Sequence, residues 1–95
     1  MANEKNTQAF VEELQEAELL PIYVASLISA DTLVTTEDCD DSEEKLLELQ
    51  DGFTKSNRVF YKEKWLKRIE DALEIVRRDR EDIRKEIEKL KGDRK

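Results

Sequence analysis

The last third of this 95-residue chain carries a heptad pattern that predicts one long amphipathic α-helix over residues 57–91. Its apolar residues follow alternating steps of three and four, and one arginine stands at a position where an apolar residue is expected. The predicted stripe consists of Leu66, Ile69, Leu73, Val76, Arg80, Ile83, Ile87 and Leu90. A helix of this length spans roughly 52 Å, whereas a compact chain of this size is about 32 Å across. A partner is therefore expected to cover the far end of the helix.

The composition agrees with a protein built from long helices. Apolar residues make up 38% of the chain and charged residues 43%, with only two glycines and one proline, which is typical of helical rather than of sheet proteins. Ninety-five residues form one domain. The predicted fold class is all-α: residues 6–56 form a small head of three short helices. The head packs on the long C-terminal helix, whose second half, residues 77–91, extends as a coiled-coil stalk.

The first two helices of the head are predicted from a capping residue and a proline. Asn6 or Thr7 is expected to cap a helix that runs to about Leu19. Pro21 fits the first position of a second helix, because its missing N–H is not needed there. Residues 22–30 are apolar on nearly all sides, which predicts a short helix at the centre of the head.

An acidic loop is predicted between the second and third helices. Residues 31–41 have no apolar period and a dense negative charge. Asp41, with Glu44 three residues later, resembles a capping box, which predicts that the third helix begins near Ser42. Gly52 and the polar residues after it indicate a break before the long helix. A single uninterrupted helix from Ser42 onward is the alternative, because one internal glycine costs only about 1 kcal/mol.

The charges beside the heptad stripe favour a parallel homodimer. In a parallel pair, Asp79 meets Arg84 and Glu86 meets Lys91 of the other chain, whereas an antiparallel pair brings like charges together. Each such pair is worth about 0.2–0.5 kcal/mol. The expected partner is therefore a second copy of the chain, and another helical protein is the alternative. The predicted function is assembly, as a non-catalytic protein–protein interaction subunit.

Catalysis and cofactor binding have no support in the residues. The chain has no histidine, no Gly-rich phosphate loop and no nucleophile constellation. The spacing Asp38-x-Asp40-x-Ser42 resembles the start of a calcium loop, but Glu43 stands where that loop needs glycine, and Leu49 stands where it needs an acid. We therefore expect no enzyme, no metal, no cofactor and no small-molecule substrate.

Two alternative functions follow from an uneven distribution of charge. Residues 1–50 carry thirteen acids and two bases, whereas residues 51–95 carry eleven acids and fifteen bases. The basic and aromatic segment 55–68 could bind nucleic acid, with phosphates on its bases and stacking on its aromatics. Its expected contact residues are Lys62, Lys64, Trp65 and Lys67. Conversely, the acidic half could mimic nucleic acid and inhibit a nucleic-acid-binding protein. The mimic surface would comprise Glu12, Glu13, Glu16, Glu18 and residues 37–44.

The expected location is intracellular, in the cytoplasm or nucleus. Cys39 is the only cysteine, so the fold does not depend on an internal disulfide. Residues 1–8 lack an apolar signal core. The longest apolar run, residues 19–30, is too short to span a bilayer. A soluble protein without membrane contact is therefore predicted.

Overall fold

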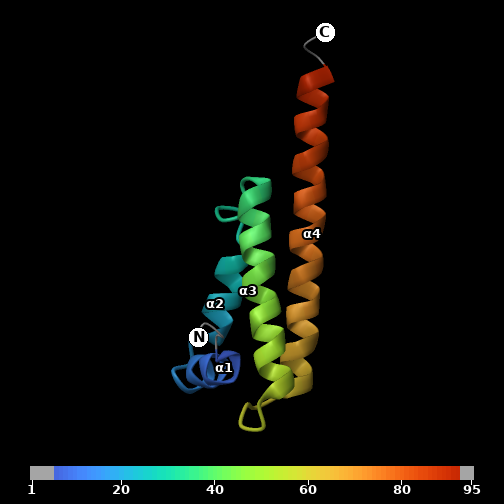
Figure 1. Cartoon of the computed structure of the whole chain (residues 1–95). Helices are drawn as coiled ribbons and strands as arrows, with labels where there is room; N and C mark the ends of the chain where they lie inside the picture. The colour runs from blue at the N-terminus through green and yellow to red at the C-terminus, as the bar shows by residue number, and fades with distance from the viewer. Residues whose placement is uncertain (1–5, 93–95) are drawn as a thin grey trace, which may run out of the picture.

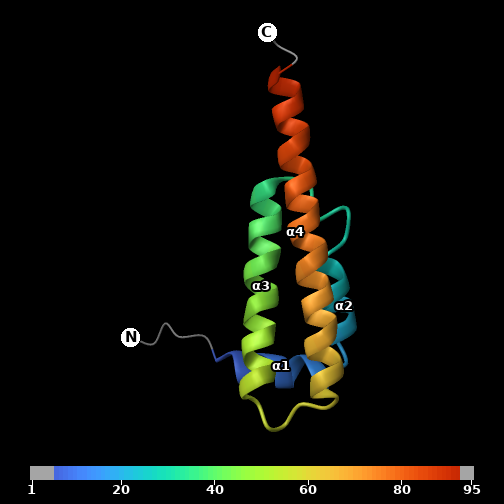
Figure 2. The same cartoon turned by 90° about the vertical axis from the view of Figure 1, so that its right-hand side faces the viewer.

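The computed structural model describes residues 6–92, which form four α-helices and no strand. They are α1 (Thr7–Glu16), α2 (Leu20–Leu27), α3 (Thr36–Lys55) and α4 (Lys62–Gly92). α3 and α4 form an antiparallel hairpin, α1 lies across its closed end, and α2 runs beside α3 (Figures 1 and 2). The prediction of an all-α fold with a helical head on a long C-terminal helix is therefore confirmed.

The hydrophobic core lies mainly between α3 and α4. Each of these helices contributes a stripe at steps of three and four, and α1 and α2 add side chains to the same cluster. Fully burying one such side chain stabilises the fold by about 1.5–3 kcal/mol. The fully buried apolar side chains include Val11, Leu20, Leu46, Leu49, Phe53, Ile69 and Val76.

α3 begins six residues before the predicted start and is not short. Thr35 caps it: the Thr35 hydroxyl accepts a hydrogen bond from the Asp38 N–H, and the Asp38 side chain accepts one from the Thr35 N–H. The prediction of an acidic loop through Asp41 is wrong for residues 36–41, which are helical. The buried positions at this end of α3 are occupied by the small residues Cys39 and Ser42, so the hydrophobic period is weak in the sequence.

The break between α3 and α4 is present, but Gly52 does not cause it. α3 continues through Gly52 to Lys55, and residues 56–61 connect it to α4. A Cβ at Gly52 would lie 2.3 Å from the Thr7 carbonyl oxygen, so the missing side chain allows α1 to cross α3 at this point. Ser56 fixes the connection, because its buried hydroxyl donates to Glu12 Oε2 at 2.6 Å.

α2 lies at the margin of the head and not at its centre. It begins at Leu20, and Pro21 follows at its start. Leu20, Val24 and Leu27 are buried and Tyr23 packs half-buried against the core, whereas Ile22 is largely exposed. The prediction that the second helix lies at the centre of the head is therefore wrong, and part of the apolar surface of α2 is exposed to solvent.

α4 is longer than the hairpin partner that covers it. Figure 1 shows its C-terminal part rising beyond the start of α3, and the molecule measures 56 × 33 × 19 Å along its principal axes. Ile83 is the last stripe residue that packs against the core cluster. We call residues 84–92 the projecting end of α4. None of the four helices is long and apolar enough to cross a membrane.

Candidate interaction surfaces

The first half of the predicted partner stripe is used inside the chain. Ile69, Leu73 and Val76 are buried in the core cluster, on the face of α4 that packs against α3. The prediction that these three residues contact a partner is wrong. The reason is that α3 is long enough to cover α4 over this distance, which the short third helix of the prediction was not.

Arg80, at the one polar position of the stripe, pairs with α3 rather than with a partner. Its Nη1 donates to Asp40 Oδ1 and to Glu43 Oε1, both at 2.8 Å, while Arg77 Nε donates to Glu43 Oε2 at 2.7 Å. These bonds from Arg80 and Arg77 lower the pKa of Glu43 below its ordinary value. The expectation that Arg80 lies in an interchain seam is therefore also corrected.

The projecting end of α4 retains the uncovered part of the stripe. Ile87 is 43% exposed and Leu90 is 63% exposed, while Ile83 is half-buried against the core. On a helix, residues 87 and 90 lie within about 40° of residue 83, so they continue the face that α3 covers below. This is an apolar strip without a covering element in the described part of the chain.

Three of the four residues predicted to form interchain charge pairs lie on this projecting end, and the fourth, Asp79, lies before it beside Arg80. Arg84, Glu86 and Lys91 are exposed, and Asp79 is partly buried. Arg84 Nη1 donates to Glu81 Oε1 at 3.2 Å within the same helix. That exposed bond is worth only a few tenths of a kcal/mol, so it leaves Arg84 able to rearrange toward another chain.

The start of α3 and the end of α4 carry opposite charges. The first turns of α3 present exposed acids, and the projecting end presents exposed lysines. Each sign is placed where the helix dipole favours it, negative at an N-terminus and positive at a C-terminus. The acids are Glu37, Asp40, Asp41 and Glu44, and the lysines are Lys85, Lys89 and Lys91.

A second surface, which sequence reasoning missed, lies between α2 and α4. Two neighbouring hollows of about 340 and 250 Å³ share Pro21 and Trp65 and so form one depression, which we call the aromatic groove. α2 packs mainly on α1 and α3, which leaves the space beside α4 open. The groove is lined by Gln15, Glu18, Leu20, Pro21, Val24, Ala25, Ile28, Phe60, Tyr61, Trp65, Arg68, Asp71, Ala72 and Ile75.

Phe60 and Tyr61 stand at one end of the groove with most of their surface in solvent. Phe60 is 68% exposed and Tyr61 is 74% exposed. The sequence prediction began the long helix at residue 57, which is wrong for these two residues because α4 begins at Lys62. Residue type alone gave no signal of this exposure.

A two-way hydrogen bond holds these aromatics in place. Gln15 Nε2 donates to the Phe60 carbonyl oxygen, and the Phe60 N–H donates to Gln15 Oε1, both at 2.7 Å. The amide of Gln15 thereby replaces the partners that the backbone of the connection lacks. The connection between α3 and α4 is thus fastened to α1.

Two residues at the same end of the groove have left-handed backbone conformations. Glu18 has φ 60° and Tyr61 has φ 55°, and both line the first hollow. A left-handed conformation costs a residue other than glycine about 1–3 kcal/mol and often marks a functional site. In the described residues these are the only two such cases.

The predicted nucleic-acid contacts are only partly available. Trp65 is 9% exposed and stacks on Phe53 with ring centroids 6.4 Å apart, so it offers no free face to a base. Lys62 Nζ donates to the Ser56 carbonyl oxygen, and Lys67 lies 3.8 Å from Asp71. Lys64 lies over the Tyr61 ring. The stacking role predicted for Trp65 is therefore wrong.

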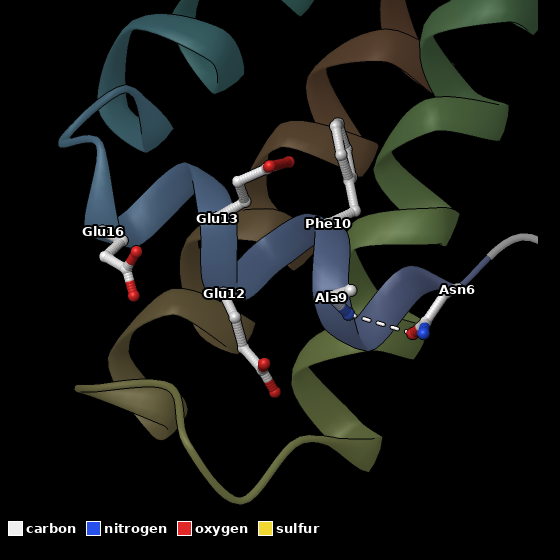
Figure 3. Close-up of a pocket in the computed structure, with 6 residues that line it drawn as sticks. All are labelled: Asn6, Ala9, Phe10, Glu12, Glu13 and Glu16. Carbon is white, nitrogen blue, oxygen red and sulfur yellow. Dashed lines mark hydrogen bonds between the residues drawn. The ribbon is translucent and has the colours of Figure 1, made fainter.

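The predicted acidic mimic surface is divided between two ends of the head. The Thr7 hydroxyl donates to Asp51 Oδ2, which places α1 beside the C-terminal part of α3, about 20 Å along that helix from Asp38. In Figure 3, Glu12, Glu13 and Glu16 line a hollow beside α1 with Asn6, Ala9 and Phe10, and their carboxylates point in different directions. These acids do not form one continuous surface with residues 37–44.

Metal-ligating groups do not converge either, because no cluster of three acidic, histidine or cysteine side chains in residues 6–92 could hold a metal ion.

Comparison of the chain with protein-family models, with curated proteins and with solved structures finds no match.

Proposed function

We propose that this chain is a non-catalytic assembly subunit that pairs with a second copy of itself through the projecting end of α4. The observation that carries the proposal is the apolar strip of Ile87 and Leu90, which continues the buried stripe beyond the reach of α3. A second helix lying on this strip would bury it as α3 buries the stripe below. An intracellular, soluble location suits such a subunit, since the only cysteine is a buried free thiol.

The position of α3 favours an antiparallel pair over the parallel pair expected from the flanking charges. A partner helix running parallel to α4 on this face would continue into the space that α3 occupies beside Arg80. An antiparallel partner instead approaches from beyond the start of α3 and stops there. The flanking pairs are worth only about 0.2–0.5 kcal/mol each, whereas overlap with α3 is a steric exclusion.

Charge and helix dipoles support the same orientation. In an antiparallel pair, the C-terminus of one α4 approaches the N-terminus of the partner's α3. Lysines such as Lys89 and Lys91 then come near acids such as Glu37 and Asp41. The two helix dipoles also meet head to tail, with the negative end of α4 against the positive end of α3.

The proposed pair is weak. Each copy contributes two half-exposed side chains, and full burial of one such side chain yields about 1.5–3 kcal/mol. Association itself costs about 4–15 kcal/mol in translational and rotational freedom. We therefore expect a dissociation constant of about micromolar or higher.

Sedimentation velocity over a concentration series tests the proposal. The chain should shift from monomer to dimer with concentration, and the double variant Ile87→Asp, Leu90→Asp should remain monomeric with an unchanged helical circular dichroism spectrum. Both positions are exposed, so the head should stay folded. The exposed pair Lys85→Gln, Glu88→Gln is the control and should still dimerise. A wild-type chain that stays monomeric up to millimolar concentration would contradict self-association.

A further inference from the structure

The aromatic groove is a surface separate from the projecting end of α4, and its composition is unusual for an exterior face. Phe60 and Tyr61 line it and are largely exposed, although large aromatic side chains are normally withdrawn from water. Contiguous exposed apolar surface of this kind marks interaction sites. Exposure of a single apolar side chain would need no explanation, but Phe60 and Tyr61 lie together at one end of one groove.

We propose that the aromatic groove binds an acidic amphipathic helix of a partner protein. The groove follows α4 from Tyr61 to Ile75, about 21 Å at the helical rise. A partner helix of about 14 residues matches that length. An elongated apolar groove flanked by two helices is the usual receptor for such a helix, which inserts its apolar face at every third or fourth residue.

The charges along the groove identify the acidic character of the partner. The α2 side has no charged residue between Leu19 and Ala30, and Glu18, just before it, lines the same hollow as Tyr61 at one end of the groove. On the α4 side, Lys64 lies over the ring of Tyr61 with Nζ 5.7 Å from its centroid, and Arg68 lies over Trp65 at 5.1 Å. Asp71 also lines the groove but is paired with Lys67. A bound helix therefore meets positive charge along the α4 side, which acids on that flank would complement.

The groove is built before any partner arrives. Gln15 fixes the Phe60 backbone through two hydrogen bonds, and Trp65 is held between Phe53 and Arg68. The left-handed Tyr61 turns its ring outward at the mouth of the groove. A rigid aromatic side chain gives contact area at a low cost in conformational entropy, which favours binding.

Selection from a display library of helical peptides of about 14 residues, with the full chain as bait, tests the proposal. The enriched peptides should be amphipathic, with aspartate or glutamate beside the apolar face. Their binding should change the fluorescence of Trp65, which is the only tryptophan of the chain and lies where the two hollows meet. A library that yields no binders, or binders without acids, would overturn the proposal.

Paired variants place the binding in the groove. Phe60→Ser with Tyr61→Ser should weaken the selected peptides at least about tenfold, and Lys64→Glu with Arg68→Glu should weaken acidic peptides but not versions with lysine in place of the acids. All four positions are exposed, so the fold should persist, and circular dichroism checks this. The variant Ile87→Asp, Leu90→Asp, altered only at the projecting end, should bind the peptides unchanged.

The same variants also test two other possible occupants of the groove, a second copy of the chain and a membrane. If wild-type self-association is lost in the Phe60→Ser, Tyr61→Ser variant, the groove is filled by a second copy and the proposal is wrong. If the wild type but not this variant sediments with phosphatidylcholine vesicles that contain phosphatidylserine, the groove is a membrane contact and the proposal is equally wrong. These readouts do not depend on whether the projecting end of α4 dimerises.

Discussion

Arg80 on α4 and Glu43 on α3 lie 2.8 Å apart, Nη1 to Oε1, near the last turn of α4 that α3 covers. Both side chains are about one-fifth exposed, so water screens the pair only partly. Glu43 also accepts a hydrogen bond from Arg77. The three side chains therefore tie α3 to α4 at the end of the hairpin opposite the connection. Beyond it, Ile83 is the last apolar residue of the α4 stripe that packs against the core cluster.

The Arg80–Glu43 contact predicts a pH-dependent stability. Because its folded-state pKa is lowered, Glu43 stabilises the fold at pH values above its unfolded pKa of about 4.3, and this contribution is lost as the pH falls through the lower folded value. Glu43→Gln should reduce the free energy of unfolding by about 1 kcal/mol at pH 7. Urea unfolding at pH 7 and at pH 3 should show a smaller difference at pH 3, and an equal difference at both would contradict the prediction.

The crossing of α1 over α3 predicts a strong effect at Gly52. A Cβ there would lie 2.3 Å from the Thr7 carbonyl oxygen and 2.9 Å from Val11 Cγ1. Gly52→Ala should destabilise the protein by about 1–3 kcal/mol, although alanine favours a helix by about 1 kcal/mol. Gly92→Ala is the matched control, because no atom lies within 4 Å of its added Cβ. Thermal unfolding compares the two variants, and equal melting temperatures would contradict the close approach.

The two hydrogen bonds between the Gln15 side chain and the Phe60 backbone predict that a substitution at Gln15 changes hydrogen exchange locally rather than throughout the chain. Gln15→Ala removes the acceptor of the Phe60 N–H, so hydrogen exchange at that amide should accelerate about tenfold or more, while protection in α3 and α4 stays the same. Gln15→Glu keeps an acceptor but loses the donor, and should retain most of the protection. NMR-detected exchange measures both, and uniform acceleration across the chain would indicate a general loss of stability instead.

The antiparallel orientation predicts which engineered cysteines form disulfides. In a Cys39→Ala background, a mixture of Ile87→Cys and Leu90→Cys copies should cross-link between unlike copies, because position 87 of one chain faces position 90 of the other. Leu90→Cys alone should cross-link poorly, whereas a parallel pair would place the two Leu90 positions together and cross-link them readily. Non-reducing electrophoresis separates the two cases, since a disulfide requires Cα atoms about 4.4–6.8 Å apart.

The sequence predicted the long C-terminal helix, but it did not show which of its residues another helix of the same chain covers. The heptad stripe predicted α4, yet it could not show that α3 covers Ile69, Leu73 and Val76. The covering face of α3 begins with Cys39 and Ser42 inside an acidic segment, where small side chains give little hydrophobic signal. Arg80 was similarly ambiguous, because its partners Asp40 and Glu43 are about forty residues away in the chain.

The aromatic groove was beyond sequence reasoning for a different reason. Apolar residue types predict burial, and Phe60 and Tyr61 follow that expectation only if they belong to α4. Their exposure depends on the left-handed Tyr61 and on Gln15, which lies 45 residues away in sequence. A contact between one amide side chain and one backbone position leaves no periodic trace.

The length of α4 also sets the valency of the proposed assembly. The aromatic groove lies along the first half of this helix, and the dimerising strip lies at its other end. Two copies joined through these ends would therefore display two identical grooves, with centres roughly 60 Å apart at the helical rise. Targets arrayed at that spacing would bind both grooves at once, with an avidity far above the affinity of either groove alone. The length of α4 beyond α3 would thus set the spacing of the targets that the dimer prefers.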